Sequence, residues 1–164
     1  MLRIRSLIPL SCLKSLYFSL IHPFFLYVLP VFGATYANHL EPLKLLQKRA
    51  IRLISGAAYF DHTEPLFFQN KILKLDDLYK HSIACYAYKN PETLNEFQRD
   101  HRFNTRYRDL LLPPLERLRS SQQSVVYNAV VIWNDIPNSI KECPSLVSFK
   151  FQYRKYLLEQ YNVQ

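Results

Sequence analysis

Glycine is nearly missing from this 164-residue chain, which contains only Gly33 and Gly56. Phosphate-binding loops and dinucleotide fingerprints need several glycines close together, because only glycine lets backbone amides approach a phosphate closely. Tight β-hairpin turns also depend on glycine. The scarcity therefore excludes glycine-loop nucleotide sites and hairpin-rich sandwiches or barrels, and it favours an all-α fold.

Cysteine is sparse and scattered, at Cys12, Cys85 and Cys143. A disulfide framework needs an even set, and a zinc site needs pairs at short spacing. His81 stands four residues before Cys85 on an expected helix, but no second pair completes a set of four ligands. We therefore expect free thiols, no metal, no other cofactor and an intracellular protein of the cytoplasm or nucleus.

Acidic residues are outnumbered by basic ones, 13 to 21, which gives a formal net charge of +8. The surplus is concentrated in the first 55 residues, where seven basic residues face one acid, Glu41. Such a surplus favours an anionic partner, either nucleic acid or the head groups of a membrane.

Charged side chains are absent from 15–40, and 16–32 is densely apolar. The length would allow a membrane-spanning helix. However, Pro23 and Pro30 each remove a backbone donor and disfavour helix in the preceding residue, so we expect two short helices, 11–21 and 23–32. A small membrane-inserted protein that uses residues 16–36 is the alternative.

The clearest helix is predicted over 38–55. Asn38 and Glu41 have the spacing of a capping box, and Gly56 stands where a left-handed C-cap is wanted. The positions expected to be buried are Leu43, Leu46, Ala50, Ile51 and Ile54. The opposite face carries Lys44, Lys48, Arg49 and Arg52.

Further helices are predicted from Thr63, from Asp76-Asp77 to Lys89, over 124–135 and from Ser145. Adjacent aspartates hold magnesium in polymerases, but there they sit on a hairpin between strands, whereas a helical stripe follows Asp76-Asp77. We expect this pair to complement the positive end of a helix dipole. No catalytic residue is identified anywhere in the sequence.

The segment 99–108 alternates arginines with aromatic residues. Guanidinium groups bind phosphates while rings stack on bases, so Arg102, Arg106 and Arg108 are candidates for nucleic-acid binding. The other interpretation is a solvated basic loop whose aromatic residues pack inward.

Several short motifs resemble, in order, the region downstream of the catalytic palm in non-LTR (LINE-type) retrotransposon reverse transcriptases. They run through nearly the whole chain, and their order and spacing are more specific than any one of them. They are 16–23 (LYFSLIHP), 33–36 (GATY), 45–52 (LLQKRAIR), 61–67 (DHTEPLF), 72–80 (ILKLDDLYK), 101–106 (HRFNTR), 132–137 (IWNDIP) and 145–150 (SLVSFK).

The resemblance implies a thumb-like helical bundle over 1–90, followed by a C-terminal extension over 91–164 with an arginine-rich segment and a terminal helix. In such enzymes the thumb grips the template–primer duplex, and the catalytic aspartates lie on the palm. We therefore expect a truncated fragment without polymerase activity of its own. Its expected partners are non-specifically bound RNA or DNA duplex and the palm and fingers of a parent polymerase, with no small-molecule substrate.

The chain departs from the family pattern at Phe32, where tryptophan is usual, and over 120–127, which lacks a common glycine. Two rival functions stay open at this point, the membrane-inserted protein and a helical protein-interaction domain. The removal of a palm would also expose an apolar thumb surface, which we expect around Tyr17, Phe24, Phe25 and Tyr27.

Overall fold

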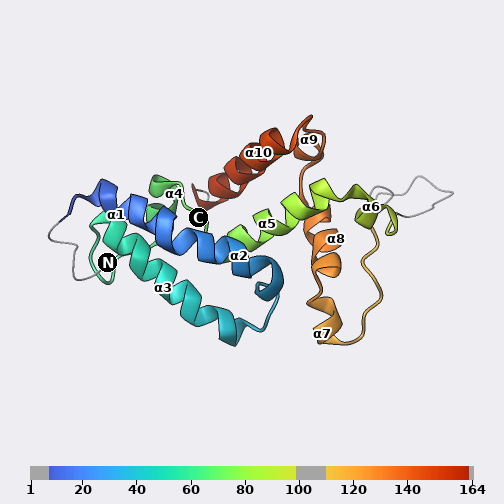
Figure 1. The fold of residues 1–164 in the computed structure, drawn as a ribbon, viewed down its shortest axis with the longest axis horizontal. Coiled ribbons are helices and arrows are strands. Elements are labelled where there is room, and N and C mark those ends of the chain that lie inside the picture. The colour runs from blue at the N-terminus through green and yellow to red at the C-terminus, as the bar shows by residue number, and fades with distance from the viewer. Residues whose placement is uncertain (1–7, 99–109, 163–164) are drawn as a thin grey trace. The chain divides into compact units, whose positions relative to one another are not determined.

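The structure is a computed structural model that describes residues 8–98 and 110–162. These residues form helices joined by turns and loops, with no strand among them, which confirms the all-α prediction (Figure 1). The chain divides into two compact units, Met1–Tyr79 with Arg154–Gln164, and Lys80–Tyr153. The functional division expected near residue 90 stays a prediction, because compactness alone does not test it.

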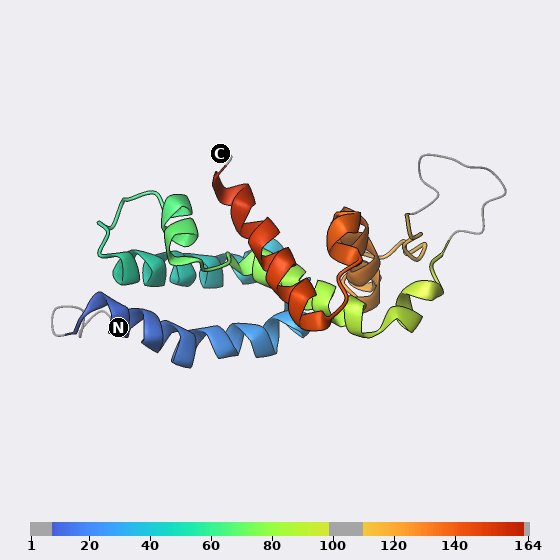
Figure 2. The same cartoon turned by 90° about the horizontal axis from the view of Figure 1, so that it is seen from above.

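The first unit is built around a pair of helices, α1 and α3, that lie side by side in both views (Figures 1 and 2). Leu13 and Ile51 are fully buried in its core. Burying one such side chain contributes about 1.5–3 kcal/mol. The elements of this unit are α1 (Leu10–Leu16), the π-helix η2 (Tyr17–Ile21), α2 (His22–Phe32), α3 (Ala37–Ser55), α4 (Glu64–Asn70), the start of α5 (Leu75–Lys89), the end of α10 (Leu146–Glu159) and the 3-10 helix η3 (Gln160–Asn162).

The break expected at Pro23 is wrong, because α1, η2 and α2 form one continuous helical stretch. In a regular α-helix the Pro23 ring would clash with the carbonyl of Ser19. The chain instead widens into a π-turn over the five residues before His22. Such a turn is one of the ways in which a helix accommodates a proline without ending.

The helix predicted over 38–55 is confirmed as α3, but its start and one buried position differ from the prediction. Its N-cap is Tyr36, and no side chain caps it, so the Asn38 capping box is wrong. Gly56 adopts the expected left-handed conformation, with φ of 68°. Ala50, Ile51 and Ile54 are buried as predicted, and Leu43 is half-buried. Leu46 is 55% exposed, however, and Gln47 is buried in its place.

Two other helix starts are confirmed by their local chemistry. Helix α5 has Asp76 and Asp77 in its first turn, where carboxylates oppose the positive end of the helix dipole. The backbone N–H of Ser148 donates to Oγ of Ser145 over 3.2 Å, which identifies Ser145 as the cap of α10.

The continuous helix Leu10–Phe32 leaves much of its apolar surface exposed. Tyr17 is fully buried, so its place in the expected exposed face is wrong, and Phe25 is half-buried. By length and apolar composition this helix meets the requirement for crossing a membrane, which core helices of soluble proteins and signal sequences also meet. The exposed side chains that share one face by spacing are Leu20, Phe24, Tyr27 and Val31.

Glycine is required at position 33, directly after α2, because the side chain of Tyr79 on α5 lies against its backbone. A Cβ at this position would lie 2.2 Å from Cδ2 of Tyr79 and 2.6 Å from the carbonyl oxygen of Leu29. Both distances are well inside van der Waals contact, so only glycine fits without displacement of the ring. The GATY motif therefore has a packing role, independent of any binding role.

The second unit contains the rest of α5 and α10 together with α6 (Pro91–Asn95), α7 (Arg119–Gln122), α8 (Val125–Asp135) and α9 (Asn138–Lys141). The buried ring of Phe149 stacks on Tyr88, with centroids 4.6 Å apart, and on Trp133, at 5.9 Å. The Asn134 amide accepts from the N–H of Leu111 and donates to its carbonyl, both over 2.9 Å. This reciprocal pair attaches the segment before α7 to α8.

We predict that Gly33→Ala lowers the free energy of unfolding by about 1–3 kcal/mol, because the added methyl group overpacks the contact with Tyr79. Urea denaturation followed by circular dichroism measures the loss. In a Tyr79→Leu background the same substitution should cost less, since the clashing ring is gone. Equal costs in the two backgrounds would contradict the packing role.

We also predict that the 164-residue chain self-associates through Leu20, Phe24, Tyr27 and Val31, because exposed apolar patches of this kind drive association. Tyr27→Lys with Val31→Lys should shift sedimentation toward monomer. The matched control is Val147→Lys with Phe151→Lys, which changes two equally exposed apolar side chains of α10. A parent chain that sediments as a monomer at all concentrations would disprove the prediction.

Candidate nucleic-acid interface

A groove of about 1210 Å³ opens in the first unit. Its lining comes from α3, the loop between α3 and α4, α4 itself, the segment leading into α5, and η3. Cations and carboxylates both line it, so the groove is not a uniformly positive surface. The charged and titratable residues that line it include Glu41, Lys44, Lys48, Arg52, Asp61, His62, Glu64, Lys74 and Asp76.

The rotation of α3 about its axis is set by the buried side chain of Gln47. Its Nε2 donates to the hydroxyl of Tyr17 over 3.1 Å and to the carbonyl of Leu73 over 2.9 Å. Burial raises the pKa of Tyr17, although the Gln47 hydrogen bond partly offsets this, so the hydroxyl is neutral near pH 7. With Gln47 held inward, Lys44 and Lys48 line the groove.

Two of the four cations predicted on α3 are occupied by contacts within the protein. Lys44 forms an ion pair with Asp76, with Nζ 2.8 Å from Oδ2. Nε of Arg52 donates to the carbonyl of Asp61 over 3.0 Å. Part of the positive charge expected for a nucleic acid is therefore used to hold the walls of the groove.

The other two cations are more available. Lys48 lines the groove, and Arg49 is exposed on the same helix outside the groove lining. Within residues 8–98 and 110–162, neither side chain has an ion pair or a hydrogen bond. The predicted basic face therefore consists of two side chains held by contacts within the protein, Lys44 and Arg52, and two that form no ion pair or hydrogen bond among the described residues, Lys48 and Arg49.

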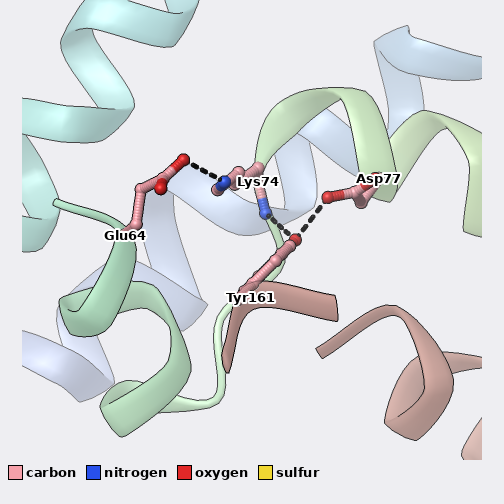
Figure 3. Close-up of polar contacts among 4 residues, drawn as sticks. All are labelled: Glu64, Lys74, Asp77 and Tyr161. Atoms are coloured by element: carbon pink, nitrogen blue, oxygen red, sulfur yellow. Dashed lines mark hydrogen bonds and ion pairs between the residues drawn. The ribbon is translucent and has the colours of Figure 1, made fainter. Parts of the chain in front are cut away.

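One wall of the groove is closed by Lys74 and Glu64, whose charged groups lie 2.6 Å apart (Figure 3). The hydrogen bond from Lys74 and its positive charge lower the pKa of the Glu64 carboxyl. A lowered carboxyl pKa adds stability above the ordinary pKa, and this stability is lost as the pH falls through the lowered value. Because Glu64 is largely exposed, water screens this contribution.

Tyr161 fastens the C-terminal element η3 to the start of α5 (Figure 3). Its hydroxyl donates to Oδ2 of Asp77 over 2.5 Å and accepts from the backbone N–H of Lys74 over 3.0 Å. Burial, followed by the negative charge of Asp77, raises the pKa of Tyr161, so the hydroxyl keeps its proton. Nζ of Lys74 also lies over the face of the Tyr161 ring, 4.6 Å from the ring centroid, in a cation–π contact.

The adjacent aspartates of α5 are directed to different partners, Asp76 to Lys44 and Asp77 to Tyr161. In the part of the chain that the structure describes, no group of three or more His, Cys, Asp or Glu side chains is placed to hold a metal ion. Arg102, Arg106 and Arg108 lie outside the described residues, so their predicted role stays a prediction.

The sequence did not indicate three of the residues that shape the groove, Phe60, Lys74 and Tyr161. Tyr161 reaches its partner Asp77 across 84 positions of the chain. No local periodicity or spacing signals a contact of that kind.

The fold and groove describe an all-α domain whose surface charge is mixed but basic along one helix. The chain is 32% identical over 91 residues to the RNA-directed DNA polymerase from mobile element jockey of Drosophila melanogaster. The match covers 56% of this chain and 10% of that polymerase. It confirms the resemblance to non-LTR retrotransposon reverse transcriptases: the chain is related to a region of such an enzyme.

Two other comparisons gave no match. No family model and no solved structure matches the chain.

We predict that Tyr161→Phe lowers the free energy of unfolding by about 1–3 kcal/mol, because it removes a donor to a charged acceptor and leaves the Lys74 N–H without its partner. The urea midpoint measures the loss. Tyr27→Phe, which removes a hydroxyl from an 85% exposed side chain, is the control and should leave the midpoint unchanged. A midpoint unaffected by Tyr161→Phe would show that η3 is not fastened to α5.

Proposed function

We propose that this chain is a thumb-like helical part of a non-LTR retrotransposon reverse transcriptase and that it binds the phosphate backbone of template–primer nucleic acid. Its relationship to an RNA-directed DNA polymerase supports the class of partner. The observation that carries the proposal is the placement of Lys48 and Arg49 on α3, where both are exposed and form no ion pair or hydrogen bond among the described residues.

Helix α3 suits backbone contact better than base recognition. Its basic side chains end in mobile cations, which bind phosphates as point charges or forks and carry no sequence information directly. Lys44 and Arg52 are held by contacts within the protein, whereas Lys48 and Arg49 form no ion pair or hydrogen bond among the described residues. Affinity should therefore be micromolar or weaker at physiological salt, and independent of sequence.

The proposal assigns binding to this chain and no bond-forming step. The matched polymerase is about ten times longer than the aligned region, so polymerisation is a property of that longer protein. In the reverse transcriptases that the chain resembles, the catalytic aspartates belong to the palm domain. Asp76 and Asp77 do not substitute for them, because an ion pair and a tyrosine hydroxyl already occupy them.

We predict that Lys48→Glu with Arg49→Glu weakens binding to an RNA–DNA duplex by at least tenfold at low salt, equally for all sequences. The slope of log affinity against log salt should fall by about two, one for each phosphate that the variant no longer neutralises. Fluorescence anisotropy titrations at several salt concentrations measure both quantities. Helicity should not change, because neither side chain forms an ion pair or a hydrogen bond among the described residues.

The charge-matched control is Lys89→Glu with Lys150→Glu. Both lysines are exposed and lie in the second unit, and the change in net charge is the same. If binding depended only on the net charge of the chain, the two double variants would weaken it equally. Equal weakening in both variants, or none in the α3 variant, would contradict the proposal.

A second candidate function, insertion into a membrane, is favoured by one observation, the exposed apolar face of helix Leu10–Phe32. Flotation with lipid vesicles distinguishes the two. Under our proposal the chain stays with the nucleic acid and does not float with neutral vesicles. Flotation that Tyr27→Lys with Val31→Lys abolishes would favour the membrane.

A further inference from the structure

Two aromatic side chains project into solvent from the loop between α3 and α4. Tyr59 is 64% exposed and Phe60 is 89% exposed. Turn tips are usually occupied by small or polar residues, since these satisfy the backbone locally and bury nothing. A ring as open as that of Phe60 contributes little to the core, so its faces are accessible to a ligand.

The turn that carries these rings is rigidly built. The N–H of Asp61 donates to the carbonyl of Ala58 over 3.3 Å, and the N–H of Ala58 donates back to Oδ2 of Asp61 over 2.6 Å. Nε of Arg52 donates to the carbonyl of Asp61 over 3.0 Å, which fixes the turn to α3. Tyr59 contacts Phe60 edge to face, with centroids 5.1 Å apart. A rigid ring loses little conformational freedom when it binds a ligand.

Phe60 also lies at the rim of the charged groove. Phe60 lines the groove together with Lys48 and Arg52. Arg52 is hydrogen-bonded to the carbonyl of Asp61, the residue that follows Phe60. A flat apolar face beside two cations matches a ligand with a flat aromatic face beside an anion. Nucleotides have this combination, and proteins bind single strands by pairing a basic track with stacking rings.

We infer that Phe60 stacks on an unpaired nucleobase of a single-stranded segment whose phosphates lie along Lys48 and Arg52. This inference rests on the proposed function and deepens it. The duplex backbone is held by α3, and the exposed ring receives a base only where the strand is unpaired. A fully paired duplex offers Phe60 no unpaired base.

The test compares three labelled ligands by anisotropy: a blunt RNA–DNA duplex, the same duplex with a short single-stranded overhang, and the same overhang with abasic sites. Phe60→Ala should weaken binding to the overhang duplex by roughly 5- to 150-fold. It should leave the blunt and abasic ligands nearly unchanged, because these keep the phosphates but offer no free base.

Two variants make the result specific. Phe60→Trp keeps a stacking ring, so it should restore affinity, and its added fluorescence should be quenched by the overhang but not by the abasic ligand. Phe24→Ala removes an aromatic ring of comparable exposure, 70%, from α2 and should bind like the parent.

The outcomes separate the inference from the proposed function. If the parent chain binds none of the three ligands, both fall. If it binds the blunt duplex through Lys48 and Arg49 but Phe60→Ala binds the overhang as the parent does, only the stacking role falls. A uniform weakening on all three ligands would likewise overturn stacking, because it would show a role for Phe60 in holding the turn.

Discussion

The buried amide of Gln47 is the contact on which the arrangement of the first unit depends. A polar side chain that is 2% exposed in the middle of a helix is costly unless its donors are satisfied. The two N–H groups of its Nε2 atom are both satisfied, one by the hydroxyl of Tyr17 in η2 and the other by the carbonyl of Leu73 before α5. These hydrogen bonds join α3 to both segments. Because these acceptors lie on separate elements, few rotations of α3 satisfy both, and the observed one places the lysines along the groove.

The groove is mixed in charge rather than purely basic because α4 and α5, which line it together with α3, supply carboxylates. Asp76 and Glu64 each lie within 3 Å of a lysine, and the Asp61 carbonyl holds Arg52. Such pairs stabilise only modestly at the surface, but they orient the side chains that form the walls.

Much of the fold could be predicted from the sequence, because helix starts and ends are local. Gly56, Ser145 and the Asp76-Asp77 pair each act on backbone groups within one turn, and all three predictions are confirmed. The errors arose where a distant contact overrode the local preference. Gln47 is buried in place of Leu46 because its amide is hydrogen-bonded to Tyr17 and to the Leu73 carbonyl. The helix continues through Pro23 because the π-turn before His22 avoids the clash of the proline ring with the backbone.

The candidate site was predictable only in part. Four cations on α3 follow from helical periodicity, but which of them are braced depends on Asp76 and Asp61, whose positions the periodicity does not give. The motifs behind the family resemblance include residues that hold the fold together, such as Gly33, which packs against Tyr79, and Asn134, which is hydrogen-bonded to the backbone of Leu111. These motifs therefore indicate a similar fold, whereas a binding role has to be argued from exposed side chains.

The central claim is that α3 contacts nucleic acid directly, and lysine footprinting tests it most directly. The chain is acetylated with a limiting amine-reactive ester, with and without a saturating RNA–DNA duplex, and each lysine is quantified by mass spectrometry. We expect the duplex to slow the modification of Lys48 several-fold while the exposed Lys89 and Lys150 react as before. Equal modification of Lys48 in both samples, with the duplex demonstrably bound, would contradict the account.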